Sequence, residues 1–339
     1  MTYLQTTTSA LSLAASKWPY APAFKRPVLN AHKVVIGYET VTYQEFFEDV
    51  SRYAVFWSEK LAQEDVNPGD VVSLCFTGAT EAYLETYSVP GTTYLDLLHV
   101  YAILKAGFIL HCFSVLPGSA DAMRIMIIEA GAKAFVCDED YLNKAFASVL
   151  DFGDITVFKA CKIRSPEVGD TNTATIAITP PAPEPEAIYF ILHSSGSTEG
   201  LPKLIPWTYR QIDALIRDTK LSSESEPECW GWFNEIKAAV GLAGVQQIAM
   251  YSNHISSFIK EAKSGENREI MSCLAGLRAV NLVGGTISEV DLEYLKKERV
   301  NLITNYGLTE TGGLLRSKGL RLAADEPDYL EEIPSANMR

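Results

Sequence analysis

The sequence predicts an α/β protein of two packed subdomains, with mixed, mostly parallel sheets covered by helices. Short apolar segments alternate with longer segments in which apolar residues recur every three or four positions, and this alternation is typical of a parallel sheet with helical connections. Apolar residues make up 47% of the chain and charged residues 21%, which supports a full core and excludes global disorder. The length of 339 residues corresponds to about two domains.

The first helix is predicted to begin at Tyr43, with Thr42 as its N-cap. Apolar side chains then recur at helical spacing, at Tyr43, Phe46, Phe47, Val50, Tyr53, Ala54, Trp57 and Leu61. A turn at Asn67–Asp70 leads into a predicted buried strand at Val71–Phe76. The next helix is predicted at Tyr94–Lys105, and Gly107 lies just beyond it, where a C-terminal cap favours glycine.

A second strand is predicted at Phe108–Val115, followed by a helix at Ala120–Glu129 that ends before Gly131. A short strand is predicted at Ala134–Cys137. Strands that are separated by helices in this way are expected to pair in parallel.

A segment with four prolines, Thr179–Glu186, is predicted to be a stiff connector. We therefore expect a first subdomain at 1–178, the connector at 179–186, a second subdomain at 187–315 and a tail at 316–339. The regular elements expected beyond the connector are strands at Ala187–Leu192, Val280–Val283 and Val300–Thr304, and helices at Tyr209–Asp218 and Glu289–Glu298.

The charge and the cysteines narrow the class of protein. A net charge of −13 argues against a nucleic-acid partner or an anionic membrane surface, although it leaves room for a local phosphate site. The chain has six cysteines and no Cys-x-x-Cys motif, as expected for reduced thiols in the cytoplasm. Neither a membrane-spanning helix nor a signal peptide is predicted.

The densest chemical pattern follows the strand expected at Ala187–Leu192. It contains four hydroxyl side chains, two glycines and one lysine, namely Ser194, Ser195, Ser197, Thr198, Gly196, Gly200 and Lys203. Glycines let backbone N–H groups approach an anion, hydroxyls can donate hydrogen bonds to phosphate oxygens, and Lys203 supplies a positive charge. No Gly-Lys-Ser/Thr follows, so this is not a Walker A loop. A solvated polar loop is the alternative, but the order of the pattern favours phosphate binding.

This pattern resembles the adenylate-forming superfamily: acyl-CoA synthetases, luciferases and the adenylation domains of nonribosomal peptide synthetases. Its members carry a Thr/Ser-Ser-Gly-Ser/Thr-Thr-Gly-x-Pro-Lys loop, which is matched closely by Ser194–Thr198 and Gly200–Lys203. His193 and the following Ile205–Trp207 look most like fungal synthetase-like carboxylic acid reductases, such as relatives of aminoadipate reductase.

Two later segments support the resemblance in the family's order. Asn281–Thr286 is similar to a strand that ends in two glycines beside the adenine, and Asn305–Thr311 is similar to the Tyr-Gly-x-Thr-Glu motif. The resemblance implies that Tyr306 stacks on the base, Thr309 donates to the α-phosphate and Glu310 binds Mg²⁺ through oxygen. With the opening segment at 41–46, it covers about residues 30–315.

The resemblance thus implies two sets of site residues. The catalytic set is Lys203, Thr309 and Glu310, and Glu310 is also the metal ligand. The nucleotide-binding set is Ser194, Ser195, Gly196, Ser197, Thr198, Gly200, Lys203, Gly284, Gly285, Thr286, Asn305, Tyr306, Gly307 and Thr309.

The implied reaction joins a carboxylic acid to ATP, with Mg²⁺, and yields an acyl-adenylate and pyrophosphate. Thioesterification with a carrier-protein phosphopantetheine or a CoA thiol, or reduction, would follow. The alternatives are a noncatalytic nucleotide-binding remnant and a scaffold fragment from an incomplete gene model. The sequence does not specify the acyl substrate.

Three departures from the family pattern predict an impaired enzyme. Glu199 adds a residue and a negative charge to the phosphate loop. Lys203 and Tyr306 are only 103 positions apart (306 − 203), which indicates a deletion near Phe233 in the acyl pocket. The C-terminal lid with its catalytic lysine is expected to be absent.

The histidines lack metal-ligand spacing. His32, His99, His111 and His254 are expected to be structural, whereas His193 ends a strand beside the phosphate loop and is a weaker candidate for the site.

Overall fold

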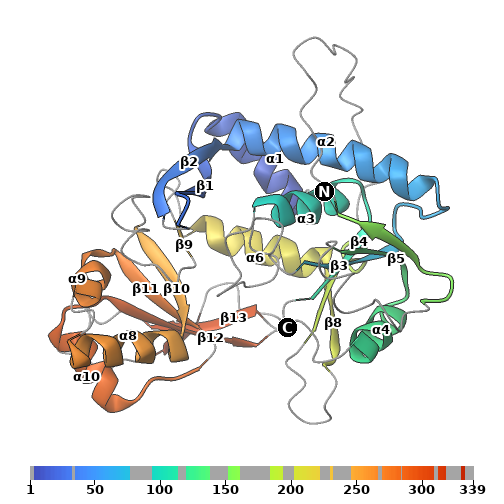
Figure 1. The fold of residues 1–339 in the computed structure, drawn as a ribbon. Coiled ribbons are helices and arrows are strands. Elements are labelled where there is room, and N and C mark those ends of the chain that lie inside the picture. The colour runs from blue at the N-terminus through green and yellow to red at the C-terminus, as the bar shows by residue number, and fades with distance from the viewer. Residues whose placement is uncertain are drawn as a thin grey trace. The chain divides into compact units, whose positions relative to one another are not determined.

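The computed structural model describes residues 4–32, 35–76, 94–113, 120–137, 152–160, 184–193, 202–221, 230–231, 246–265, 269–283, 285–308, 312–317 and 330–332. It divides into two compact units (Figure 1). The first consists of Met1–Phe24 and Val41–Ile216, and the second of Lys25–Thr40 and Arg217–Arg339.

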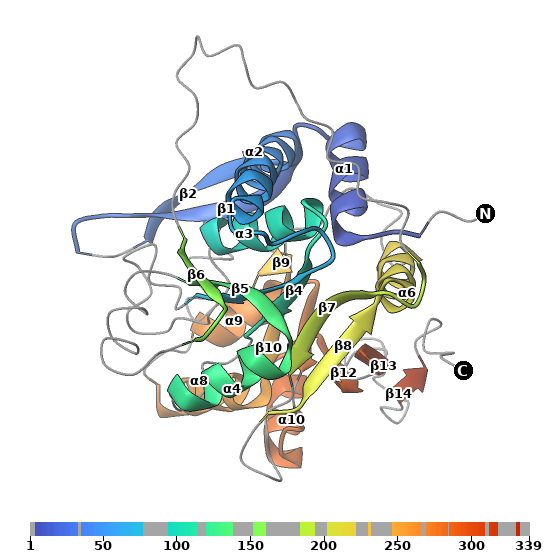
Figure 2. The same ribbon diagram turned by 90° about the vertical axis from the view of Figure 1, so that its right-hand side faces the viewer.

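A six-stranded sheet lies at the centre of the first unit, in the order β6-β5-β3-β4-β7-β8 (Figure 2). Its first five strands are parallel, and β8 pairs antiparallel with β7. The bounds are β3 (Val71–Cys75), β4 (Ile109–Cys112), β5 (Ala132–Cys137), β6 (Thr156–Lys159), β7 (Ile188–His193) and β8 (Leu204–Thr208). The parallel arrangement brings the carboxyl ends of β3, β4 and β7 to one edge of the sheet.

Helices α1 (Thr7–Lys17), α2 (Tyr43–Ala62), α3 (Tyr94–Lys105) and α4 (Ala120–Glu129) belong to the same unit, and α6 (Tyr209–Leu221) begins in it. Helix α2 begins after Thr42 because a capping box satisfies its first backbone donors. The Thr42 hydroxyl accepts from the Glu45 N–H at 3.2 Å, and the Glu45 carboxylate accepts from the Thr42 N–H at 2.7 Å.

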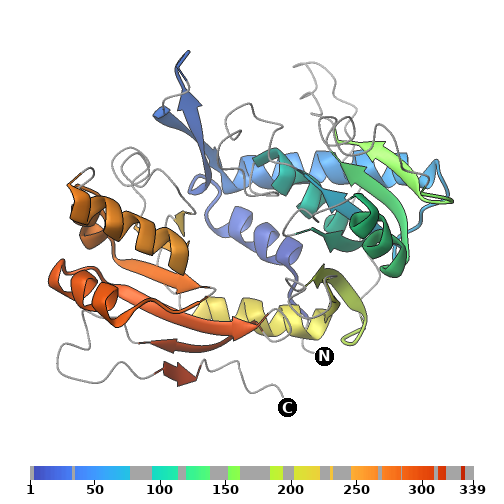
Figure 3. The ribbon, with the colours of Figure 1, turned by 60° about the horizontal axis from the view of Figure 1, so that its bottom comes forward.

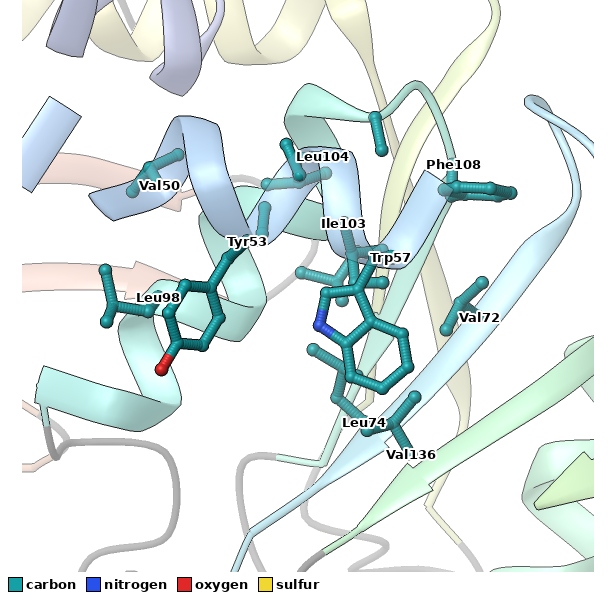
Figure 4. Close-up of a cluster of buried hydrophobic side chains, with 14 of the residues drawn as sticks. Val50, Tyr53, Trp57, Val72, Leu74, Leu98, Ile103, Leu104, Phe108 and Val136 are labelled. Atoms are coloured by element: carbon teal, nitrogen blue, oxygen red, sulfur yellow. The ribbon is translucent and has the colours of Figure 1, made fainter. Parts of the chain in front are cut away.

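The apolar stripe of α2 packs against α3 and the sheet (Figure 4). Trp57 is 1% exposed, and its indole points toward Leu74 and Val136 of neighbouring strands. Its Nε1–H donates to Nδ1 of the buried His99 at 2.9 Å. An aromatic side chain of this size contributes about 3–5 kcal/mol to stability when it is fully packed, so Trp57 is a main support of this core.

The second unit contains another six-stranded sheet, in the order β14-β13-β12-β11-β10-β9. Strands β9 to β12 are parallel, and β13 and β14 are antiparallel to their neighbours. The bounds are β9 (Trp230–Gly231), β10 (Gln247–Tyr251), β11 (Ala279–Val283), β12 (Leu302–Leu308), β13 (Gly312–Ser317) and β14 (Leu330–Glu332).

In the described part of this unit, helices α8 (Ser252–Ser264), α9 (Glu269–Gly276) and α10 (Glu289–Lys297) pack against the strands (Figure 3). Alternate strand residues enter their common core, including Ile248, Met250, Val280, Leu282 and Leu302. The residues between them face the other side of the sheet, because side chains alternate along a strand.

A two-stranded hairpin of β1 (Pro22–Leu29) and β2 (Val35–Thr42) is shared by the two units. Phe24 and Val41 contribute to the core of the first unit, whereas Tyr38 packs against the core of the second. The chain therefore passes between the units at 24/25, 40/41 and 216/217.

The predicted fold class is confirmed, as are its main elements. The helices predicted at Tyr94–Lys105 and Ala120–Glu129 have the predicted bounds, and α2 begins after Thr42 as expected. Strand β12 begins two residues later than predicted and extends to Leu308, so it contains part of the Tyr-Gly-x-Thr-Glu segment.

The division into units differs from the boundary expected at 179–186. Strand β7 pairs with β4, and β8 pairs with β7, so both lie in the first unit. Residues 179–183 of the connector, Glu199, and the deletion expected near Phe233 lie outside the described residues. In the described parts of the chain, no helix is long and apolar enough to span a membrane.

Candidate functional site

The phosphate loop predicted from the sequence connects two strands whose ends are held together. His193 of β7 pairs with Leu204 of β8 in an antiparallel register. Lys203 immediately precedes β8 and is exposed. The remaining loop residues (Ser194, Ser195, Gly196, Ser197, Thr198 and Gly200) lie outside the described residues. Strand pairing thus places Lys203 next to the base of this connection.

A buried series of contacting side chains runs from Ser73 through His111 and Phe113 to His193, where the same connection begins. The Ser73 hydroxyl and His111 Nδ1 are 2.9 Å apart across β3 and β4. The rings of His111 and Phe113 have centroids 4.7 Å apart, and those of Phe113 and His193 are 5.5 Å apart. Burial, followed by the nearby His193, lowers the pKa of His111 to about 3. His111 is therefore a neutral, structural imidazole near neutral pH.

Two predicted nucleotide-binding residues follow β11 in the second unit. Gly285 has a φ of +153°, and a Cβ at this position would lie 2.8 Å from Oγ of Ser252, the first residue of α8. A larger residue at position 285 would therefore require the Ser252 hydroxyl to move and would adopt a backbone conformation that favours glycine. Thr286 follows as an exposed residue, and Gly284 lies outside the described residues.

The neighbouring strand β12 carries Asn305, Tyr306 and Gly307. The pairing of β12 with β13 is irregular between Tyr306 and Gly307, as in a β-bulge, and such bulges re-aim side chains near functional sites. Nδ2 of Asn305 lies 3.4 Å from Oδ1 of Asn281 on β11. Thr309 and Glu310 lie outside the described residues.

The structure places the predicted residues in both units. Gly285 and Thr286 follow β11, and Asn305 lies within the neighbouring β12, directly after its pairing with β11, whereas Lys203 belongs to the first unit. Parallel strands expose their carboxyl ends at one edge, where α/β proteins bind ligands. No group of three or more His, Cys, Asp or Glu suited to a metal ion occurs within the described ranges.

The structural role expected for His111 agrees with its burial, but the sequence interpretation missed the polar partners Ser73 in the first sheet and Gln247 and Asn281 in the second. Each lies in a short, otherwise mainly apolar strand and is buried. A single polar residue inside such a strand must be hydrogen-bonded, and this signal could have found them.

Comparisons with known proteins bear on the fold. No protein-family model matches the chain. The AMP-binding domain-containing enzyme iboA of Amanita muscaria is 20% identical over 353 aligned positions, which cover 93% of this chain and 64% of that enzyme. The o-succinylbenzoate CoA synthetase of Bacillus subtilis superimposes with a TM-score of 0.66 at 15% identity, covering 95% of this chain and 62% of the synthetase.

The chain shares the fold of these proteins. A further structure of this fold, the NpsA N-terminal subdomain of Klebsiella oxytoca, matches with a TM-score of 0.64 and 14% identity over 93% of this chain and 77% of that one. The shared fold agrees with the order of motifs along the sequence. The chain spans a little under two thirds of the curated relative and of the synthetase.

Proposed function

We propose that this chain binds MgATP and acts in the adenylation of a carboxylic acid. The observation that carries the proposal is the hydroxyl- and glycine-rich segment 194–200, which joins the paired strands β7 and β8, with Lys203 exposed at its end. The fold supports it, as does the description of the Amanita relative as an AMP-binding domain-containing enzyme. The Bacillus synthetase has also been solved in complex with AMP.

The proposed nucleotide contacts fall into two groups, one for the phosphates and one for the nucleoside. Ser194, Ser195, Ser197 and Thr198 donate hydroxyl hydrogen bonds to phosphate oxygens, and Gly196 and Gly200 allow backbone N–H groups to approach them. Gly284, Gly285, Thr286, Asn305, Tyr306 and Gly307 hold the nucleoside. The close approach of Gly285 to Ser252 fits a position that needs glycine.

In the proposed reaction a carboxylate oxygen attacks the α-phosphorus and the bond to pyrophosphate breaks. Lys203 stabilises the negative charge on the leaving pyrophosphate, and Thr309 donates to an α-phosphate oxygen. Mg²⁺ held by Glu310 would supply further positive charge at the phosphates. The chain contributes mainly by positioning the two reactants and stabilising charge.

The acyl group would then pass to a thiol, with release of AMP, or be reduced by an external hydride donor. A carrier-protein phosphopantetheine or CoA is the proposed acceptor, and the similarity to an artificially fused adenylation–carrier protein of Klebsiella oxytoca supports the former. We propose a cytoplasmic location, where thiols such as the buried Cys75 and Cys137 stay reduced.

Two measurements on the purified full chain test the function. Calorimetry with MgATP measures nucleotide binding, and ATP–pyrophosphate exchange with aryl, aliphatic and amino-acid carboxylates measures adenylation. Binding together with exchange is the expected result. Binding without exchange would indicate a nucleotide-binding remnant, and the absence of both would reject the proposal.

A further inference from the structure

Three carboxamide side chains form a row across the second sheet. Gln247 comes from β10, Asn281 from β11 and Asn305 from β12, which are consecutive parallel strands. Gln247 is 7% exposed and Asn281 is 4% exposed, while Asn305 is half-buried. A buried amide that lacks hydrogen-bond partners destabilises a protein. The partners of these three side chains therefore show what the row does.

The strand register places the three side chains on one face. Asn281 pairs with Ala249 on one side and with Ile303 on the other. Gln247 and Asn305 each lie two residues from those partners, and residues two apart share a face of the strand. This face is the one opposite the helix-covered core of Val280 and Leu282.

The hydrogen bonds of the row all run in one direction. Asn305 Nδ2 donates to Asn281 Oδ1 at 3.4 Å, and Asn281 Nδ2 donates to Gln247 Oε1 at 3.3 Å. Asn305 Nδ2 also lies 3.5 Å from the carbonyl oxygen of Ile303. Because the amide nitrogen of Asn305 is turned toward these acceptors, its Oδ1 is the atom left to meet a ligand.

We propose that Asn281, supported by Gln247, is a positioning residue that holds Asn305 as a hydrogen-bond acceptor for a ligand N–H or O–H group. This inference rests on the proposed function. An unconstrained asparagine can rotate its amide by 180° and present a donor instead. The row could reverse its direction only if all three amides flipped together, and the carbonyl oxygen of Ile303, which can only accept, opposes that reversal. A ligand that offers only an acceptor to Asn305 therefore binds more weakly.

Two parts of the proposed reactants carry such a donor. One is the exocyclic amino group of adenine, and the other is an amino or hydroxyl group on the carboxylic acid. A comparison of ATP with ITP tests the adenine amino group, because hypoxanthine has an acceptor oxygen in its place. Two matched pairs of acyl-sulfamoyl adenosines test a donor on the carboxylic acid: the alanyl compound against the propionyl compound, and the 3-hydroxybenzoyl compound against the benzoyl compound.

The test compares wild type with Asn281→Asp and Asn281→Leu by calorimetry. A buried aspartic acid tends to stay protonated, so its carbonyl oxygen can accept from Asn305 and its hydroxyl can donate to Gln247. Leucine has a similar size but can do neither. Asn281→Ser, whose hydroxyl is too short to reach Asn305, replaces Asn281→Leu if that variant does not fold.

Wild type and Asn281→Asp are expected to prefer the donor-bearing member of at least one pair by about 10-fold, the value of one hydrogen bond. In Asn281→Leu the same pair should bind with nearly equal affinity, and the pair that changes identifies the ligand group. If wild type bound ATP but Asn281→Leu kept the wild-type selectivity between the members of every pair, the inference would be overturned while the proposed function would stand. If wild type bound none of these probes, the proposed function would fail and the inference with it.

Discussion

His111 is an imidazole in the middle of a sheet, with Nδ1 against the Ser73 hydroxyl. Its pKa falls from the ordinary 6.5 to about 3, first because of burial and then because of His193. The folded chain keeps His111 neutral, whereas the unfolded chain protonates it below about pH 6.5. Its contribution to stability is therefore complete above pH 6.5 and is lost as the pH falls toward 3.

We expect His111→Asn, which retains a hydrogen-bonding group near Ser73, to flatten this pH dependence. A difference of this size between the folded and unfolded pKa corresponds to about 5 kcal/mol at most. Urea unfolding of wild type and variant from pH 8 to pH 3.5 measures it. Parallel curves for the two proteins would show that His111 does not titrate on unfolding.

Lys203 is an exposed, positively charged residue at the end of the predicted phosphate loop, immediately before β8. Lys203→Ala is expected to weaken MgATP binding by about 1.5–3 kcal/mol, the value of a hydrogen bond to a charged group. Lys60→Ala, at an exposed position near the end of α2, is the matched control and should bind like wild type. Equal affinities for all three proteins in calorimetry would remove Lys203 from the site.

Gly285 combines a positive φ with close approach to Ser252. Gly285→Ala is expected to destabilise the chain by about 1–3 kcal/mol, because both the backbone conformation and the contact with Oγ become unfavourable. Adding Ser252→Ala should recover part of this loss by removing Oγ. A double-mutant cycle by urea unfolding measures the coupling, and strictly additive effects would contradict the contact.

At the scale of elements, helix α2 depends on its cap. Thr42→Ala removes the hydroxyl that accepts from the Glu45 N–H and is expected to cost about 1 kcal/mol. Thr42→Ser keeps this hydroxyl and should retain most of the stability. Thermal unfolding compares the two variants, and equal losses would mean that the hydroxyl is not what matters.

Hydrogen bonds of Glu45 with the backbone and side chain of Thr42 lower the pKa of the Glu45 carboxyl. The stabilisation by the carboxylate is therefore present at neutral pH and is lost as the pH falls through that lowered value.

Helices with a regular apolar stripe and a clear terminus were predictable from local sequence. The α2 stripe begins directly after Thr42, and α3 and α4 are each followed closely by a glycine with positive φ, Gly107 and Gly131. The partners of β7 were not predictable, because the proline-rich segment before it suggested a new subdomain and pairing with β4 depends on distant residues.

The residues proposed for the site could be selected from the sequence to a similar extent. Their motifs lie in continuous segments, so Lys203, Gly285 and Asn305 stand out by pattern and remain predictions. The supporting residues could not be found in this way, since Asn281 and Gln247 act through a register that aligns three strands. Side chains that hold a site residue in place are visible only after the strands have been ordered.

At the scale of the whole molecule, the two units have separate cores. Ile103 is fully buried in the first and Leu295 in the second. Ile103→Ala and Leu295→Ala are each expected to destabilise their own unit by about 2–5 kcal/mol. Scanning calorimetry should show each variant lowering a different transition. A single transition that both variants lower equally would indicate cooperative unfolding of the whole chain.

The hairpin of β1 and β2 has a consequence for synthesis on the ribosome. Residues 25–40 are made well before residues 217–339, although the two segments belong to the same unit. Domains tend to fold in order as they emerge, but Tyr38 packs against a core whose other members, which include Leu282 and Leu295, are synthesised much later. A nascent chain that has not reached residue 217 therefore carries a β1–β2 hairpin whose packing partners have not yet been made. Such an exposed segment is a natural target for a chaperone during translation.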